Sequence, residues 1–325
     1  MIPARWLGLK WLGLVLLSLG LGCARTPVTT LRAFPEMREA VAELPITWVS
    51  LPRPAPLPPL DHAALLVPVS FDGVTGKPLY MQVDLGHPAT VFYGHKWAHL
   101  APRLRATGQG LSESKGAVQN LRFKVGNLAI AASQVAILPT QGAGIRWDTE
   151  DQEIIGTLGA DAVLGRTVVM DFKADRIQVA THRALVARPG DRFLPFRIRW
   201  RRILLPAQLE AQELPLLYDS GSSAFAFITD EPSWNRLKRP GAVEESFPVK
   251  SWKRTLMAHV VATDAKVTVA GVALPVGQVA HMEGTSWWQR TAMRIFGMGA
   301  MAGNRLFLGH RVVLDTATRE CCVSD

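Results

Sequence analysis

The sequence is poor in cysteine, with three residues among 325, at positions 23, 321 and 322. So few cysteines exclude a disulfide framework, and neighbours such as Cys321 and Cys322 rarely bridge each other because that geometry is strained. A redox motif or a cysteine metal site is excluded with it. We expect both residues to lie on a last strand as small apolar side chains, and the stability of the fold to come from its core.

Long apolar runs are also scarce. The run WLGLVLLSLGL, residues 11–21, is shorter than the roughly 20 residues that a membrane-spanning helix needs. Arg5 and Lys10 precede this run, which has the basic start and short apolar middle of a secretory signal. We therefore treat residues 1–22 as a signal peptide and exclude them from the fold.

Cys23 follows Gly22 at the end of this signal and resembles the lipid attachment site of bacterial lipoproteins. Two interpretations stay open. In the first, Cys23 carries a lipid that anchors the chain to a membrane of the cell envelope, facing the periplasm or the exterior. In the second, Cys23 is an unmodified cysteine near an ordinary signal cleavage site.

Residues 23–61 are rich in proline, with eight prolines around one short piece of helical pattern, MREAVAEL at 37–44. Proline removes backbone donors and favours extended chain. This composition predicts a tether or a strap laid on the surface, and a propeptide is the alternative.

From residue 62 onward, short β-branched and aromatic runs such as LLVPVSF and LYMQVDLG alternate with turn signals such as DGVTGKP. This alternation is typical of an all-β chain rather than of βαβ units. Helical patterns are few and short.

The chain also repeats itself. FKVGNLAIAASQVAIL (123–138) aligns with VTVAGVALPVGQVAHM (267–282), and LGADAVLGRTVVMD (158–171) aligns with AGNRLFLGHRVVLD (302–315), both at an offset of 144 residues. Upstream, GKPLYMQVDLGHPATVF (76–92) matches QELPLLYDSGSSAFAF (212–227) at an offset of 135. We infer a duplicated β domain, with halves at 62–183 and 184–325 and one aspartate per copy, Asp84 and Asp219.

Each of these aspartates closes an apolar strand and is followed by X-Gly, which permits a tight turn. If the copies pack about a pseudo-twofold axis, the two carboxyl groups meet and hold one proton between them. Such a pair can activate a water molecule with its ionised member and protonate a carbonyl oxygen with the other. Asp171 and Asp315 are repeated as well, but there we expect aspartates that end surface strands.

Four segments resemble the pepsin and retropepsin-like aspartic peptidases: YDSGSSAF (218–225), VDLGHPATVF (83–92), GTLGADAVLGRTVVMDF (156–172) and MAGNRLFLGHRVVLD (301–315). The resemblance implies a bilobal, all-β, pepsin-like fold with two duplicated β-barrel-like lobes and a cleft between them. It implies an endopeptidase that takes a peptide or protein substrate and uses a water molecule held between Asp84 and Asp219. It implies no cofactor and no metal.

The two loops match this family unequally. Gly86 and Gly221 are the turn glycines of the two copies. In the family a hydroxyl after each aspartate braces the loops against one another, and Ser220 supplies it in the second copy. Ser222 matches the serine that hydrogen-bonds its aspartate.

In the first copy, Leu85 stands where the second has Ser220, and His87 stands where the second has Ser222. A cationic imidazole so close to Asp84 would lower the pKa of that carboxyl. We therefore carry two hypotheses. One is an active endopeptidase. The other is a non-catalytic, protease-like lipoprotein that binds a peptide or a partner.

Other candidate sites are weaker. None of the tyrosines, Tyr80, Tyr93 and Tyr218, falls in the flap region expected at 105–130, so any flap is of the simpler retropepsin kind. His95 and His99 have the spacing of a zinc pair on a helix, but Lys96 stands where His-Glu-x-x-His needs its glutamate. We expect two surface histidines there.

Two further segments have a structural and a functional interpretation each. FRIRWRR, residues 196–202, predicts a strand with one wet face, and its alternative is attraction to an anionic membrane surface. Nucleic acid is not an expected partner of an exported protein. Trp287 and Trp288 predict core packing, with an apolar lip of a substrate cleft as the alternative.

Overall fold

The structure is a computed structural model, and it describes residues 31–33, 41–53, 57–139, 142–251, 254–285 and 299–325. These residues form three β-sheets with little helix, which confirms the prediction of an all-β chain. The described helices are α1 (Gly94–Ala106), α2 (Glu231–Leu237) and the short 3-10 turns η2 (Ala160–Ala162), η3 (Arg183–Leu185), η4 (Ser220–Ser222) and η5 (Asn304–Phe307).

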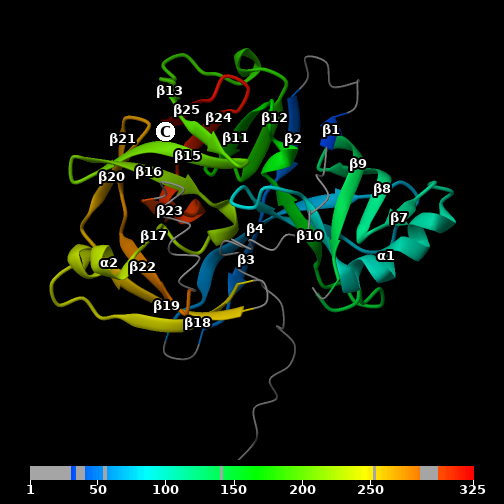
Figure 1. Cartoon of the computed structure of the whole chain (residues 1–325), viewed down its shortest axis with the longest axis horizontal. Coiled ribbons are helices and arrows are strands. Elements are labelled where there is room, and N and C mark those ends of the chain that lie inside the picture. The colour runs from blue at the N-terminus through cyan, green and yellow to red at the C-terminus, as the bar shows by residue number, and fades with distance from the viewer. Residues whose placement is uncertain (1–30, 34–40, 54–56, 140–141, 252–253, 286–298) are drawn as a thin grey trace, which may run out of the picture.

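A nine-stranded sheet, on the right in Figure 1, contains the first sequence repeat. Its strands are β1 (Leu31–Ala33), β3 (Thr47–Leu51), β4 (Leu60–Ser70), β5 (Leu79–Asp84), β6 (Val91–Tyr93), β7 (Ser112–Ser114), β8 (Ala117–Val125), β9 (Leu128–Leu138) and β10 (Glu153–Gly159). β5 pairs antiparallel with β4 and parallel with β10. β6 pairs parallel with β9, and β8 pairs with both β9 and β4, so the strands close on themselves as in a barrel.

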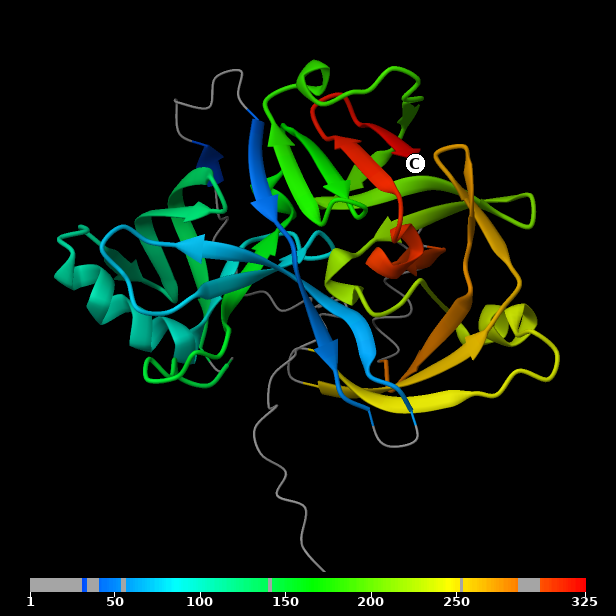
Figure 2. The same cartoon turned by 180° about the vertical axis from the view of Figure 1, so that it is seen from behind.

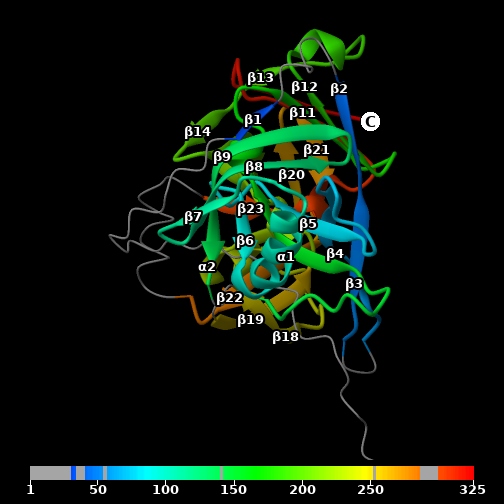
Figure 3. The same ribbon diagram turned by 90° about the vertical axis from the view of Figure 1, so that its right-hand side faces the viewer.

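A ten-stranded sheet, on the left in Figure 1 and behind the first in Figure 3, contains the second repeat. Its strands are β14 (Arg197–Arg199), β15 (Arg202–Leu209), β16 (Gln212–Tyr218), β17 (Phe227–Thr229), β18 (Glu245–Ser251), β19 (Arg254–Ala262), β20 (Lys266–Val269), β21 (Val272–Pro275), β22 (Gln278–Glu283) and β23 (Ala300–Ala302). β16 pairs antiparallel with β15 and parallel with β23, β17 pairs parallel with β22, and β20 pairs with both β15 and β21. The repeat in sequence is therefore also a repeat in strand pairing.

A six-stranded sheet, at the top of Figure 1, joins the two halves. Its strands are β2 (Val41–Pro45), β11 (Thr167–Asp171), β12 (Arg176–Ala180), β13 (Leu194–Pro195), β24 (Arg311–Asp315) and β25 (Glu320–Ser324). At its centre β11 and β24 pair antiparallel, with Val169 opposite Val313. These two valines are equivalent at the offset of 144, so the two copies are related by a local twofold axis that passes between them.

Asp171 and Asp315 end these central strands, and the expectation of aspartates that end surface strands is wrong. Each is only 3% exposed. Asp171 accepts a hydrogen bond from the Ala174 amide at 3.1 Å, and Asp315 accepts from the Ala317 amide at 3.1 Å. Their carboxylates close the turns after the strands, and the neighbouring strands of the sheet shield them from water.

The segment before residue 62 also differs from its prediction. Val41–Pro45, within the piece of helical pattern, is strand β2 paired with β12, and Thr47–Leu51 is strand β3 paired with β4. Figure 2 shows both strands running along the molecule, so residues 41–45 and 47–51 are paired into the sheets. Ala42 and Leu44 are buried and alternate with exposed Glu43. Sheet pairing and burial outweigh helix propensity in so short a segment.

The cysteines of the last strand match their prediction. Cys321 and Cys322 lie on β25, are at most 1% exposed and form no disulfide. Burial raises the pKa of the Cys321 thiol to about 12, so this residue acts as a small apolar side chain.

Candidate active site

Asp84 and Asp219 stand at equivalent places in the two sheets. Asp84 is the last residue of β5 and is paired with Gly159 of β10. Asp219 follows the last residue of β16 and precedes η4, and its amide donates to the Ala302 carbonyl of β23. In each copy a parallel neighbour strand therefore fixes the backbone that carries the carboxyl group.

Each aspartate packs against the turn glycine of the other copy. A methyl group built on Gly86 would lie 2.5 Å from Cγ of Asp219, and one built on Gly221 would lie 2.6 Å from Cγ of Asp84. Carbon atoms do not approach so closely, so only glycine fits either position. The structure thus brings together the predicted residues Asp84, Gly86, Asp219 and Gly221.

The two carboxyl groups are enclosed and close enough for each to affect the pKa of the other. Asp84 is 0% exposed and Asp219 is 1% exposed. A hydrogen bond between two carboxyl groups requires a proton on one of them, because an ionised carboxylate has no donor.

The hydrogen bonds around the pair are unequal. Asp219 accepts from the Gly221 amide at 3.0 Å through Oδ1 and from the Ser222 hydroxyl at 2.8 Å through Oδ2. Asp84 accepts from the His87 amide at 2.9 Å through Oδ1, while its buried Oδ2 has no hydrogen-bond partner among the described residues. Donors stabilise a charged carboxylate, so Asp219 is better suited to carry the charge and Asp84 to carry the proton.

The pKa values follow this asymmetry. Burial, and then the charge and hydrogen bond of Asp219, hold the pKa of Asp84 well above its ordinary value. Burial also raises the pKa of Asp219, but its hydrogen bonds to Asp84, Ser222 and the loop amides oppose that rise. The donors and the direction of both pKa values therefore favour protonation of Asp84 over protonation of Asp219.

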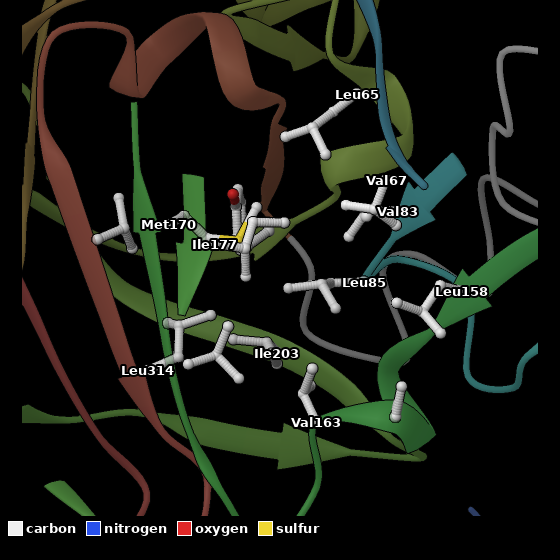
Figure 4. Packing of buried hydrophobic residues seen from close by; sticks show 14 of the residues in the cluster. Leu65, Val67, Val83, Leu85, Leu158, Val163, Met170, Ile177, Ile203 and Leu314 are labelled. Carbon is white, nitrogen blue, oxygen red and sulfur yellow. The ribbon is translucent and has the colours of Figure 1, made fainter. Parts of the chain in front are cut away.

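Ser220 braces the two loops. Its hydroxyl accepts from the Leu85 amide at 2.9 Å and donates to the Val83 carbonyl at 3.0 Å. Leu85 returns no such bond. Figure 4 shows its side chain in the apolar cluster that includes Val83 and Leu158, where it is 1% exposed.

Gln82 supplies a second brace that the sequence did not reveal. It is 3% exposed, and its Nε2 donates to the Gly221 carbonyl at 3.1 Å. The equivalent residue in the second copy is Leu217. A glutamine within an apolar strand could have indicated a buried polar contact. The sequence could not identify the partner, because Gly221 lies 139 residues further along the chain.

His87 is not the cation that the sequence suggested. Burial lowers the pKa of its imidazole to about 4, so the ring is neutral at neutral pH and does not depress the pKa of Asp84. Its Nδ1 lies 2.5 Å from the Ala89 carbonyl, which orients the ring within the loop.

Sequence reasoning also missed Arg202, which lies beside the pair. Within FRIRWRR, Arg197 and Arg199 are exposed and Ile198 is half-buried, as a strand with one wet face requires. Arg202 is instead 8% exposed and interacts electrostatically with Asp219 and Asp84. The sequence pattern does not single out Arg202. Residues 202–205 are all buried, so exposed and buried side chains no longer alternate along this part of the strand.

Two tyrosines border the pair. Burial raises the pKa of Tyr93 to about 12, and its hydroxyl lies 3.0 Å from the Thr157 hydroxyl. Burial also raises the pKa of Tyr218, which donates to Asn304 at 2.8 Å. Both phenols are therefore neutral and add no charge.

The remaining candidates are placed as follows. His95 and His99 are exposed on α1, as surface histidines should be, and no cluster of three metal-ligating side chains occurs within the described ranges. Cys23, Trp287 and Trp288 lie outside the described residues. In the part of the chain that the structure describes, no helix is long and apolar enough to cross a membrane.

No family model and no curated protein matches the chain. Among solved structures it is similar to conglutin gamma, described as a unique basic 7S globulin from lupine seeds. The two chains are 9% identical, the match covers 89% of this chain and 95% of the other, and the TM-score is 0.49.

Proposed function

We propose that the chain is an aspartic endopeptidase with a bilobal, pepsin-like fold, whose lobes are residues 62–183 and 184–325. The observation that carries this proposal is the buried pair of Asp84 and Asp219, each lodged against the glycine of the other loop. Pepsin-like sequence motifs in both halves support it, as does the repeated strand pairing.

The unequal surroundings of the pair suggest the role of each carboxyl group. The ionised Asp219 accepts a proton from a water molecule, whose oxygen attacks the peptide carbonyl carbon while protonated Asp84 donates to the carbonyl oxygen. A tetrahedral diol forms. The C–N bond then breaks as the amine takes the proton held by Asp219 and one hydroxyl of the diol returns its proton to Asp84, so the pair again holds one proton.

A specific observation favours a second candidate. Both carboxyl groups are enclosed, at 0% and 1% exposure, and a peptide reaches them only if the surrounding chain moves. Together with Leu85 in place of the bracing hydroxyl, this supports a protein that binds a peptide or partner without cutting it.

Cleavage of a diverse peptide mixture between pH 3 and pH 7 distinguishes the two candidates. The wild type is compared with Asp84→Asn and Asp219→Asn, and with Asp72→Asn, a matched change at an exposed aspartate. The endopeptidase predicts cleavage by the wild type and Asp72→Asn and none by the other two. If the wild type cuts nothing and all four proteins bind peptide equally, the binding protein is correct.

We further propose that the chain is exported and anchored in the cell envelope by a lipid on Cys23. The basic and apolar signal at residues 1–22 supports this. Mass spectrometry of the mature N-terminus tests it, because lipidation predicts a chain that begins at an acylated Cys23. A mature chain that begins at an unmodified residue would contradict it.

A further inference from the structure

Arg202 has a defined place relative to Asp219. In the antiparallel pair of β15 and β16, Leu204 lies opposite Leu217. Continuing this register by two residues places Arg202 opposite Asp219. Directly opposed residues project from the same face of a sheet, with Cβ atoms about 5 Å apart.

The first copy has no counterpart to this arginine. There Leu66 lies opposite Gln82, and the same continuation places Ala64 opposite Asp84. Ala64 is 0% exposed and carries no charge. Only one of the two aspartates therefore faces a cation across its own strand pair.

Arg202 also lacks any other source of compensation in the described ranges. It is 8% exposed, its Nε has no hydrogen-bond partner, and no carboxylate of the described residues, that of Asp219 included, lies within ion-pair distance of its guanidinium. A buried charge is costly unless an opposite charge accompanies it. The carboxyl groups that attract Arg202 are Asp219 first and Asp84 second.

The other titratable groups around the pair are neutral. His87 in the first loop, Tyr93 on β6 and Tyr218 on β16 all have pKa values displaced toward their uncharged forms. Arg202 is a buried cation whose electrostatic interactions are with this pair, Asp219 first and Asp84 second.

We propose that Arg202 is a positioning residue that keeps the negative charge of the pair on Asp219 and leaves the proton on Asp84. This inference assigns the base and the acid of the proposed function, on which it rests. It predicts that the two aspartates are not interchangeable although their loops are duplicates.

Carbon-13 NMR titration of the carboxyl groups in the full chain, labelled at aspartate, tests the assignment without any need for activity. In Asp84→Asn the remaining Asp219 titrates alone, and in Asp219→Asn the remaining Asp84 does. We expect the titration midpoint of Asp219 to lie at least about one pH unit below that of Asp84, a tenfold difference in proton affinity. Equal midpoints, or the reverse order, would overturn the proposal.

Removal of the cation provides the second arm. Arg202→Met keeps an apolar stem of similar length and should raise the midpoint of Asp219 by about one unit, and that of Asp84 by less. Arg202→Lys should restore most of the difference. Arg199→Met, a change at the exposed arginine paired with Arg202 across the β14–β15 hairpin, should leave both midpoints in place. A shift no larger than that of Arg199→Met would contradict the inference.

The arms also separate this inference from the proposed function. If no peptide is cut but Arg202→Met shifts the Asp219 midpoint as expected, the endopeptidase is wrong and the role of Arg202 stands. If peptides are cut and the midpoints agree, the endopeptidase stands and the role of Arg202 is wrong. Where Arg202→Met fails to fold, Arg202→Gln removes the same charge, and an unshifted Asp219 midpoint in that variant would overturn the proposal.

Discussion

The hydroxyl of Ser220 accepts a hydrogen bond from the backbone amide of Leu85 at 2.9 Å. The same hydroxyl donates to the Val83 carbonyl, so one side chain of the second copy holds the backbone on both sides of Asp84 in the first. In the opposite direction, Gln82 reaches the Gly221 carbonyl. The two loops are therefore braced from both sides, but by different residues.

Ser220→Ala should destabilise the protein by about 1–3 kcal/mol, because it leaves the Leu85 amide and the Val83 carbonyl without this partner in a buried place. Urea unfolding measures the loss. Ser114→Ala, at an exposed serine of β7, should change the free energy of unfolding by less than about 0.5 kcal/mol. Equal effects of the two changes would show that the brace contributes nothing.

Leu85→Ala should cost about 2–5 kcal/mol, since Leu85 is fully buried in the cluster of Figure 4 and its removal leaves a cavity. Leu194→Ala provides the comparison, because Leu194 is 39% exposed. Thermal and urea unfolding of both variants give the difference. A cost at Leu85 no greater than that at Leu194 would contradict the packing role.

Gly221→Ala should lower peptide cleavage by at least tenfold, because its methyl group would overlap the carboxyl group of Asp84 and separate the pair. Gly86→Ala should do the same through Asp219. Gly110→Ala is the control, since Gly110 has open space around it and no left-handed backbone. Kinetics on one cleaved peptide compare the three, and full activity of Gly221→Ala would refute the close packing.

Asp161 predicts a pH dependence of stability. Burial raises the pKa of its carboxyl to about 6, even though Thr90 donates to it twice. A raised pKa favours the folded state below the unfolded value near 4, and this contribution is lost as the pH rises through 6. Between pH 4 and pH 7 the wild type should lose about 2–3 kcal/mol more than Asp161→Asn. Urea unfolding at both pH values checks this, and parallel pH profiles would exclude it.

The sequence was sufficient to predict features that recur in both copies. The offset of 144 residues anticipated the strands that meet at Val169 and Val313, and the Asp-X-Gly turns located both aspartates. It did not reveal Arg202 or Gln82, because each occurs in one copy only and acts on a partner more than a dozen residues away. The strand at Val41–Pro45 was missed for a related reason: its pairing with β12 is a long-range contact that a local pattern does not encode.

Neutron diffraction from crystals of the exchanged protein near pH 6 tests the one-proton pair most directly. We predict carboxyl oxygens of Asp84 and Asp219 within about 3 Å of each other, with a single deuteron on Asp84 and none on Asp219. Two ionised carboxylates without a deuteron between them, or oxygens too far apart to share one, would contradict the account.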